Sequence, residues 1–206
     1  MDYSCSLLWQ IVILLKVVGP SEEVNYELVL EEERVFSECM DNPSGHLGME
    51  GLFDLTNLDL HMEEEGIHVE GNITSAWDIQ PTDRIEGRLT IFYLDRGTWQ
   101  ATGISVFSYD FCKVLYDEKQ FWYKAFTKYV INSDELQQKC VHYKGTLYLM
   151  EPYLLKMVFG VGGFLNPGRH RIVFNLHAID ENNEKRPNAL CFELRGEFFK
   201  TSLRAM

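Results

Sequence analysis

The sequence predicts a mainly β fold, an antiparallel β-sandwich or barrel that carries one main amphipathic helix. Apolar and polar residues alternate along several short runs, which is the pattern of strands with one buried face. Turn-forming glycine, proline and asparagine residues separate these runs, as in antiparallel sheets. Residues 111–129 instead repeat apolar side chains at three-and-four spacing, which favours a helix among the strands.

Length and composition favour a single domain. The chain has 206 residues, of which 46% are apolar, 24% charged and 13% aromatic. A chain of this length fits one domain with a sizeable core better than two. Aromatic side chains suit a deep apolar interior. No internal repeat or linker interrupts the sequence, so we expect residues 22–206 to form one domain.

The first 21 residues are expected to be a cleaved signal peptide. Their apolar run from Leu7 to Val18 is too short to span a bilayer and ends in small residues and Pro20. No Lys or Arg precedes the run, and Lys16 lies inside it, which departs from the usual pattern. No other role for this segment fits the acidic sequence that follows. We expect a secreted, extracellular protein without stable membrane insertion.

Cleavage would remove Cys5 and leave four cysteines, an even number that favours two disulfides in an oxidising compartment. The sequence alone permits three pairings. One of them joins Cys112 to Cys140 around the expected helix, and Cys39 to Cys191. The second bond would tie the beginning of the domain to its last strand. A metal site is the rival use of four cysteines, but no C-x-x-C spacing occurs, so we expect no metal.

Alternation predicts strands over residues 26–30, 53–62, 67–77, 84–95, 99–108, 146–150, 154–159, 171–179 and 190–199. Turns are expected at residues 95–97, 166–168 and 180–188. One face of the strand over residues 67–77 is apolar and holds Ile67, Val69, Ile73 and Trp77. Asn72 lies on the opposite, water-facing side and begins an N-x-T pattern, so we expect glycosylation there.

The helical segment is amphipathic and follows Asp110, which is expected to cap it. Its lysines at positions 119, 124 and 128 lie mostly off the apolar stripe. A short helical turn is expected over residues 133–139, before Cys140. The apolar stripe consists of Phe111, Leu115, Trp122, Ala125, Phe126 and Tyr129.

The charge of the chain argues against some classes of binding partner. Its formal net charge is −12 and its pI about 4.9, which argues against nucleic acid or an anionic membrane surface as the main partner. Glutamates cluster at residues 31–33 and 63–65, where solvated edges or turns are expected. A basic partner protein remains open.

No sequence pattern supports catalysis. The chain lacks a G-x-S-x-G elbow, an H-E-x-x-H motif and a P-loop. Residues 159–164, FGVGGF, lack the spacing of a phosphate-binding loop, so we expect a hairpin tip there. His61 and His68 with residues 63–65 resemble a metal cluster, but strand spacing places the two histidines on opposite sides. We therefore expect surface histidines, no enzyme and no cofactor.

Several segments together resemble a known family. The features are "DFC" at residues 110–112, Asn132, Cys140, "KGTLYL" at residues 144–149 and "LNPGRHRI" at residues 165–172. In their order and spacing the chain resembles an insect family of small secreted proteins of uncharacterised domain type. That family includes chemosensory proteins related to the ganglioside activator protein, within the wider group of secreted lipid-recognition proteins. The resemblance covers roughly residues 50 to 180.

The resemblance implies a β-sandwich opened into a cup, with an apolar cavity that accepts acyl chains or similar hydrocarbon. It also implies a link between the first and last strands, in agreement with Cys39–Cys191, and a non-catalytic role. The chemosensory branch is associated with pheromone perception. The chain departs from the family at Val141, where proline is common, and lacks additional disulfides of the activator proteins.

We therefore expect a non-enzymatic carrier of a lipid or hydrocarbon, with a membrane receptor as a further partner. The competing class is an extracellular interaction protein or receptor co-ligand with a filled core, and the third is a secreted hydrolase. The expected walls come from the sheet residues Trp77, Leu89, Ile91, Tyr93, Trp99 and Phe107. The helix is expected to add Phe121, Trp122 and Phe126, and a mobile rim Phe159, Phe164 and Leu165.

Overall fold

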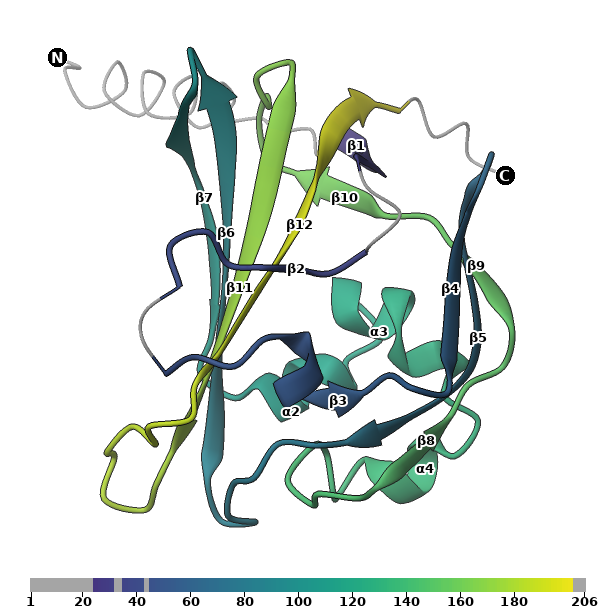
Figure 1. The fold of residues 1–206 in the computed structure, drawn as a ribbon, viewed down its shortest axis with the longest axis vertical. Helices are drawn as coiled ribbons and strands as arrows, with labels where there is room; N and C mark the ends of the chain where they lie inside the picture. The colour runs from purple at the N-terminus through teal and green to yellow at the C-terminus, as the bar shows by residue number, and fades with distance from the viewer. Residues whose placement is uncertain (1–23, 32–34, 43–44, 202–206) are drawn as a thin grey trace, which may run out of the picture.

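Two β-sheets face each other across the molecule, with short helices between them (Figure 1). The structure is a computed structural model that describes residues 24–31, 35–42 and 45–201. The expected signal peptide, with Cys5, lies outside these residues. The strands pair antiparallel within both sheets, which confirms the mainly β, antiparallel fold class.

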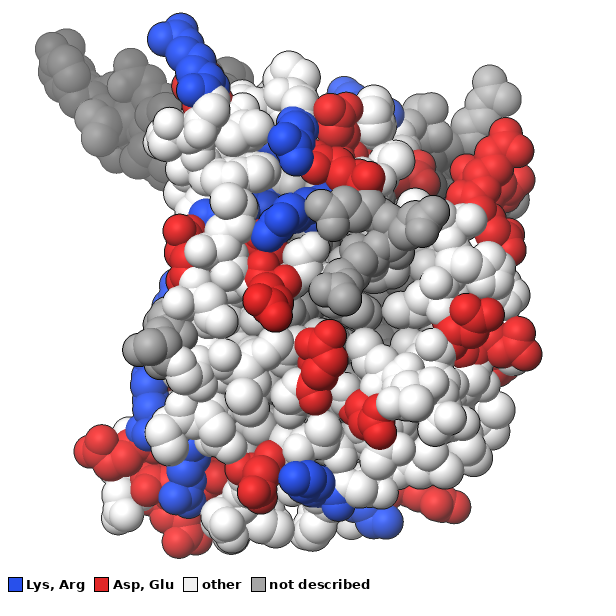
Figure 2. Space-filling view, in the orientation of Figure 1, with Lys and Arg blue, Asp and Glu red and all other residues white. Residues whose placement is uncertain are grey.

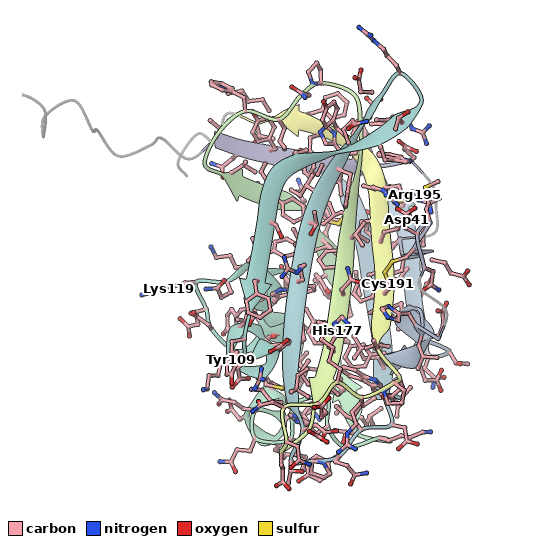
Figure 3. The ribbon with its side chains drawn as sticks, turned by 90° about the vertical axis from the view of Figure 1, so that its left-hand side faces the viewer. Asp41, Tyr109, Lys119, His177, Cys191 and Arg195 are labelled. Carbon is pink, nitrogen blue, oxygen red and sulfur yellow. A yellow bond between two sulfur atoms is a disulfide. The ribbon has the colours of Figure 1, made fainter. Side chains whose placement is uncertain are left out.

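The larger sheet has seven strands and curls around the interior (Figures 1 and 3). Its order is β10-β1-β12-β11-β6-β7, and β2 pairs with β12. The bounds are β1 Val24–Leu30, β2 Ser37–Glu38, β6 Arg84–Asp95, β7 Thr98–Ser108, β10 Val158–Val161, β11 Arg169–Ile179 and β12 Leu190–Lys200. β12 lies between β1 and β11, so the last described strand occupies the middle of this sheet.

The second sheet has five strands arranged around β5. β5 pairs with β3 and β4, which precede it, and with β8 and β9, which follow the helices. The bounds are β3 Phe53–Asp54, β4 Leu58–Glu63, β5 Gly66–Ser75, β8 Leu147–Leu149 and β9 Tyr153–Leu155. Ile67, Val69 and Ile73 of β5 are buried, whereas Asn72 is half-buried on the other side, which confirms the expected alternation.

Two of the expected strands are split. Residues 53–62 divide into β3 and β4 at a turn, where the Leu58 amide donates to the Leu55 carbonyl. Residues 154–159 divide into β9 and β10, so the chain crosses from the second sheet to the larger one at this point. The expected turn at residues 95–97 is present as a tight hairpin, with Arg96 at φ 47° and Gly97 at φ 83°.

The expected single helix over residues 111–129 is broken into short pieces. They are α2 Phe111–Leu115, α3 Phe121–Ala125 and the 3-10 turn η2 Thr127–Tyr129, followed by α4 Ser133–Leu136. Asp117 interrupts the helix because its carboxylate accepts from the Lys119 amide and the Gln120 side chain. Thr127 donates to the Leu115 carbonyl and so fixes α2 against η2. The remaining short helix is η1 Met49–Gly51.

Both expected disulfides are present. Cys112, in α2, is bonded to Cys140, and Cys39 is bonded to Cys191 of β12, each with Cα atoms 5.8 Å apart. In the chain-entropy model the two closures contribute up to about 3.5 and 5 kcal/mol to the free energy of unfolding. The first bond holds the helical region at both ends, and the second holds residues 35–42 against the larger sheet. No helix within residues 24–31, 35–42 and 45–201 is long and apolar enough to cross a membrane.

Candidate ligand-binding site

An apolar cavity of about 130 Å³, which we call the inner cavity, lies between the two sheets. The larger sheet contributes Phe174, Leu176, Phe192 and Leu194 to its wall. The second sheet contributes Leu58, Leu60, Ile67, Val69 and Ile73 from β4 and β5. The helices contribute Leu115, Phe121, Trp122 and Phe126. These side chains come from segments far apart in the sequence, so the cavity exists only in the folded chain.

No charged side chain is among the described residues that line the inner cavity. One polar group at its wall, the Tyr153 hydroxyl, donates to the Ala125 carbonyl at 3.0 Å. Burial, with a smaller contribution from Tyr129, raises the pKa of Tyr153 well above its usual range, so the hydroxyl stays neutral. A cavity of this size with apolar walls offers water too few partners and stays dry.

A second, open space of about 540 Å³, which we call the outer cleft, adjoins the inner cavity. It lies between the β6–β7 edge of the larger sheet, α3 and β10. Figure 3 shows the β7 edge with Lys119 on the loop beyond it. The two spaces share six lining residues: Phe111, Phe121, Trp122, Ala125, Phe174 and Leu176. The shared residues of α3 therefore form a partition between them.

Aromatic contacts hold this partition in place. Trp122 packs edge-on against Phe111 at 5.2 Å and against Phe174 at 5.1 Å between ring centroids. Phe121 stacks on Phe159 of β10 with centroids 4.4 Å apart. Each such pair stabilises by about 0.5–1.5 kcal/mol beyond its buried area. Because Phe121 and Trp122 both lie on the five-residue helix α3, a shift of this helix would change the partition and both spaces together.

The charges around the outer cleft have one sign. Four exposed basic residues line it, Arg88, Lys119, Lys124 and Lys156, and no carboxylate is among its described lining residues. In the whole chain, acidic residues outnumber basic ones by 31 to 19, so this distribution differs from that of the rest of the chain. Lys156 forms an ion pair with Glu65 at 3.1 Å. The Arg88 guanidinium lies over the Phe107 ring at 5.4 Å.

Seven of the twelve expected wall residues line these two spaces. Phe126 lines the inner cavity, and Phe121 and Trp122 line both spaces. The outer cleft is also lined by the expected residues Leu89, Ile91, Phe107 and Phe159. Whether these seven residues contact a ligand stays a prediction.

The other five expected wall residues line neither space. Trp77 is fully buried elsewhere in the core, where its indole nitrogen donates to the Asn188 carbonyl at 2.8 Å. Trp99 lies on the outer face of the larger sheet, with the Arg171 guanidinium 5.3 Å from its ring. Tyr93, near the β6–β7 hairpin, is not among the residues that line either space.

The expected rim at residues 164 and 165 is also misplaced. Phe164 is 84% exposed, and its ring lies 6.0 Å from the Lys200 ammonium, away from both spaces. Leu165 is buried, and its amide donates to the Tyr26 hydroxyl at 3.2 Å. Both residues follow β10, so they lie past the end of the cleft.

Sequence reasoning missed the wall that the second sheet provides. The apolar face of β5 was recognisable from its alternation, but no local signal showed which sheet that face opposes. It also missed that the basic residues line one cleft, since Arg88 lies in β6, Lys124 in α3 and Lys156 in the connection between β9 and β10. The sequence places Lys119 and Lys124 off the apolar stripe but does not show that they line a common cleft.

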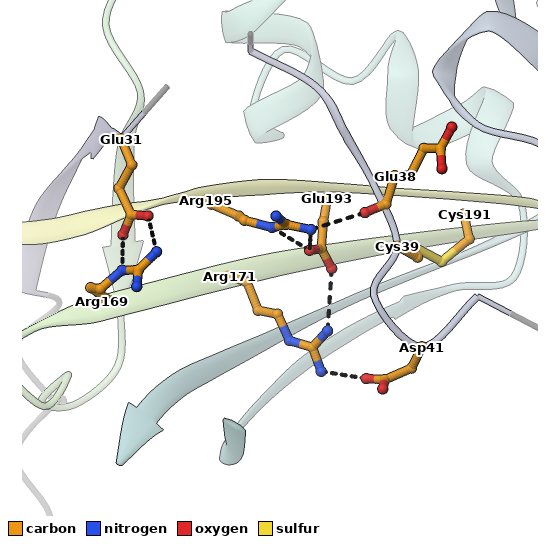
Figure 4. A network of polar contacts seen from close by, with 9 residues as sticks. All are labelled: Glu31, Glu38, Cys39, Asp41, Arg169, Arg171, Cys191, Glu193 and Arg195. Atoms are coloured by element: carbon orange, nitrogen blue, oxygen red, sulfur yellow. Dashed lines mark hydrogen bonds and ion pairs between the residues drawn. A yellow bond between two sulfur atoms is a disulfide. The ribbon is translucent and has the colours of Figure 1, made fainter. Parts of the chain in front are cut away.

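A buried charged network on the outer face of the larger sheet is separate from these spaces (Figure 4). Arg171 and Glu193 are 4% and 0% exposed, and their side chains approach to 3.3 Å. Arg195 pairs with the same carboxylate, and Arg171 also pairs with Asp41. Asp41 and Cys39 both belong to residues 35–42, so the network and the disulfide hold this segment on β12 together. We assign the network a structural role.

The expectation that His61 and His68 face opposite sides is wrong. Strand spacing carries over from residue 61 to residue 68 only in a continuous strand, whereas a two-residue turn at Glu64 and Glu65 reverses the chain between β4 and β5. The two histidines are direct cross-strand partners, and their rings stack with centroids 4.6 Å apart. They lie on the outer face of the second sheet, away from the inner cavity.

The fold and the two spaces together define a mainly β protein in which an apolar cavity lies between antiparallel sheets and short helices. No protein-family model matches the chain, and the search of curated proteins found no match either.

Proposed function

We propose that the protein is a secreted, non-enzymatic carrier of an amphiphilic lipid with an anionic head group. The observation that carries this proposal is the junction of an uncharged inner cavity with an outer cleft whose charged lining residues are all basic. A hydrocarbon portion would lie in the inner cavity, and an acidic head would lie in the outer cleft.

The inner cavity favours a hydrocarbon. An unfilled cavity of about 130 Å³ corresponds to about 3 kcal/mol of lost packing, at about 24 cal/mol per Å³. A hydrocarbon would recover contacts there, and its transfer from water contributes about 25 cal/mol per Å² of buried apolar area. The cavity alone is smaller than typical ligand sites of about 300–1,000 Å³, whereas the adjoining cleft of about 540 Å³ is within that range.

The outer cleft favours a negative head group. Its basic residues Arg88, Lys119 and Lys124 are exposed, so a bound carboxylate, sulfate or phosphate could stay partly hydrated while contacting them. The apolar lining between them, from Leu89 and Phe159, would contact the adjoining part of the chain. A ligand that occupied both spaces would have to pass the partition, so we expect the Phe121 and Trp122 side chains to move on binding.

Two further observations support the secreted part of the proposal. The paired cysteines form two disulfides, which persist in oxidising compartments. Asn72 is half-buried on the outward side of β5, with Ile73 buried next to it, which is the orientation that glycosylation needs. The resemblance to insect chemosensory proteins makes a pheromone or another lipid cue the ligand class to test first.

A protein-binding role is the second candidate, because three large side chains near one end of β7 are exposed. Val106, Phe107 and Tyr109 are 57%, 52% and 61% exposed. An extracellular partner or a membrane receptor could cover them. In that case the inner cavity would hold no ligand, and no lipid would bind with measurable affinity.

Native mass spectrometry of the purified protein, followed by displacement of a fluorescent fatty acid, tests the proposal. A long-chain fatty acid should displace the probe better than the alcohol of equal length. Lys119→Gln combined with Lys124→Gln should reduce this preference by about three- to tenfold, as expected for exposed charge pairs. Lys144→Gln, an exposed lysine outside the cleft, is the matched control. Absence of both co-purified lipid and probe binding would exclude the carrier function.

A further inference from the structure

The β4–β5 hairpin brings three side chains of metal-binding types together on its outer face. His61 and Glu63 lie two residues apart on β4, and His68 lies opposite His61 on β5. One ligand atom from each of these three residues lies within 4.8 Å of the other two. All three are accessible, with side-chain exposures of 51%, 47% and 28% for His61, Glu63 and His68. A dissolved cation could therefore reach them without any change in the fold.

The separations match those of ligands around a small metal ion. His61 Nε2 lies 3.4 Å from Glu63 Oε1, and His68 Nδ1 lies 3.6 Å from the same oxygen. These distances are longer than an N–H···O hydrogen bond of about 2.7–3.2 Å. Two atoms bound to a tetrahedral zinc ion at about 2.1 Å are about 3.4 Å apart. For one ion to bind all three atoms, at least one imidazole would have to rotate out of the stacked arrangement, because the lone pair of each nitrogen lies in the plane of its ring.

The other nitrogen of each histidine faces a second carboxylate. His61 Nδ1 lies 3.6 Å from Asp59 Oδ2, and His68 Nε2 lies 3.5 Å from Glu70 Oε2. Histidines that bind metals usually direct their remaining ring N–H to a carboxylate, which fixes the tautomer and makes the ligand nitrogen more basic. Each imidazole of this hairpin therefore has one nitrogen near Glu63 and the other near a second carboxylate, but the second contacts are longer than hydrogen bonds and would have to shorten when an ion binds.

The charge of the hairpin favours a cation. Asp59 and Glu70 are direct cross-strand partners, a pairing of like charges that destabilises a sheet unless positive charge lies nearby. Glu64 and Glu65 form the adjacent turn. Figure 2 shows acidic side chains gathered along the side of the molecule where β4 and β5 lie. Lys156 pairs with Glu65 at the turn, outside the group of three ligands.

We propose that His61, Glu63 and His68 bind a divalent transition-metal ion of the zinc class, with Asp59 and Glu70 orienting the two imidazoles. Three protein ligands leave the fourth position to water or to a donor from another molecule. The site is separate from the proposed lipid site, but it lies on the opposite face of the hairpin that forms part of the wall of the inner cavity. Leu58, Leu60, Ile67 and Val69 of the same hairpin face the inner cavity. A bound ion would tie β4 to β5 and so make this wall more rigid.

Isothermal titration of the untagged protein with zinc chloride, in a buffer that does not bind metals, tests the proposal. We expect one ion per chain, and a higher melting temperature in zinc chloride than in magnesium chloride. His61→Asn and His68→Asn should each weaken zinc binding at least about tenfold, and Asp59→Asn by about tenfold, since outer partners typically contribute about 10–100-fold. Glu64→Gln is the control, because it removes one negative charge from the same hairpin but no ligand; its affinity should stay within about threefold.

A spectroscopic measurement separates coordination from nonspecific attraction to acidic side chains. Electron paramagnetic resonance of the protein with one equivalent of copper(II) should show coupling to two imidazole nitrogens, and to one nitrogen in either single histidine variant. The variants lie on an exposed face, so their melting temperatures without metal should match that of the wild type. The proposal is overturned if millimolar zinc gives no saturable binding, or if the double histidine variant binds zinc as tightly as the wild type.

Discussion

Replacing Ala125 by leucine tests whether the inner cavity is space that another group can fill. Ala125 lies on α3 and lines both the inner cavity and the outer cleft. Leucine adds three carbons, which would stabilise by at most about 2.4 kcal/mol at about 0.8 kcal/mol per buried CH₂. The entire cavity corresponds to about 3 kcal/mol of lost packing. Because the fit will be imperfect, we expect the free energy of unfolding to rise by about 1–2 kcal/mol.

Urea unfolding with the disulfides intact measures this change as a higher midpoint at an unchanged slope. The same variant should bind the fluorescent fatty acid more weakly, since leucine would occupy the space of the hydrocarbon. Alanine and leucine have similar helix propensities, so the effect would not come from α3 itself. Ala101→Leu, at an exposed position of β7, is the control and should change neither quantity. A lower midpoint together with unchanged probe affinity would refute the reasoning.

Three further predictions concern stability. Replacing Cys112 and Cys140 together by serine should lower the free energy of unfolding by up to about 3.5 kcal/mol, because the two positions, 28 residues apart, are then no longer linked in the unfolded chain. An unchanged urea midpoint contradicts this. Burial of Asp83 opposes its ionisation, but hydrogen bonds and charge from Arg186 outweigh burial and hold the pKa of Asp83 below 3.8. The ionised carboxylate therefore contributes fully to the free energy of unfolding above pH 3.8, and this contribution is lost as the pH falls through the lowered pKa. Asp83→Asn should make the urea midpoint fall less steeply as the pH is lowered in the acid range. An equally steep fall contradicts this. Burial lowers the pKa of His170 below 6.5 despite its hydrogen bond to Gly168, so its contribution to the free energy of unfolding declines as the pH falls below 6.5. NMR titration should show the low pKa. His170→Gln should remove this part of the loss of stability at low pH.

Local patterns predicted the strands well where one face of the strand is buried along its whole length. The alternation of Ile67, Val69 and Ile73 is present in β5 as expected, because the period of two is a property of the strand itself. The helix was predicted as one piece because its stripe is continuous in the sequence. Its interruption depends on the side-chain hydrogen bonds of Asp117 and Thr127, and spacing does not reveal these.

The candidate site was predictable only in part, because its walls join elements that are distant in the chain. The aromatic residues of α3 could be found from periodicity alone. The pairing of His61 with His68 could not, since the Glu64-Glu65 turn lacks the Asn-Gly or Asp-Gly signal of a tight hairpin. Trp99 was placed on the wrong face for a related reason: alternation divides a strand into two faces but does not say which one meets the other sheet.

The central position of β12 has a consequence for the biosynthesis of the protein. β1 and β11 both pair with β12, so the larger sheet cannot be completed until residues 190–200 have been synthesised. Cys39 likewise lacks its native partner until Cys191 follows it, 152 residues later. During that interval its thiol is available to Cys112 or Cys140. Folding is therefore expected to be late and slow, as for other chains dominated by distant strand pairs, and to depend on a compartment that can exchange wrongly paired disulfides.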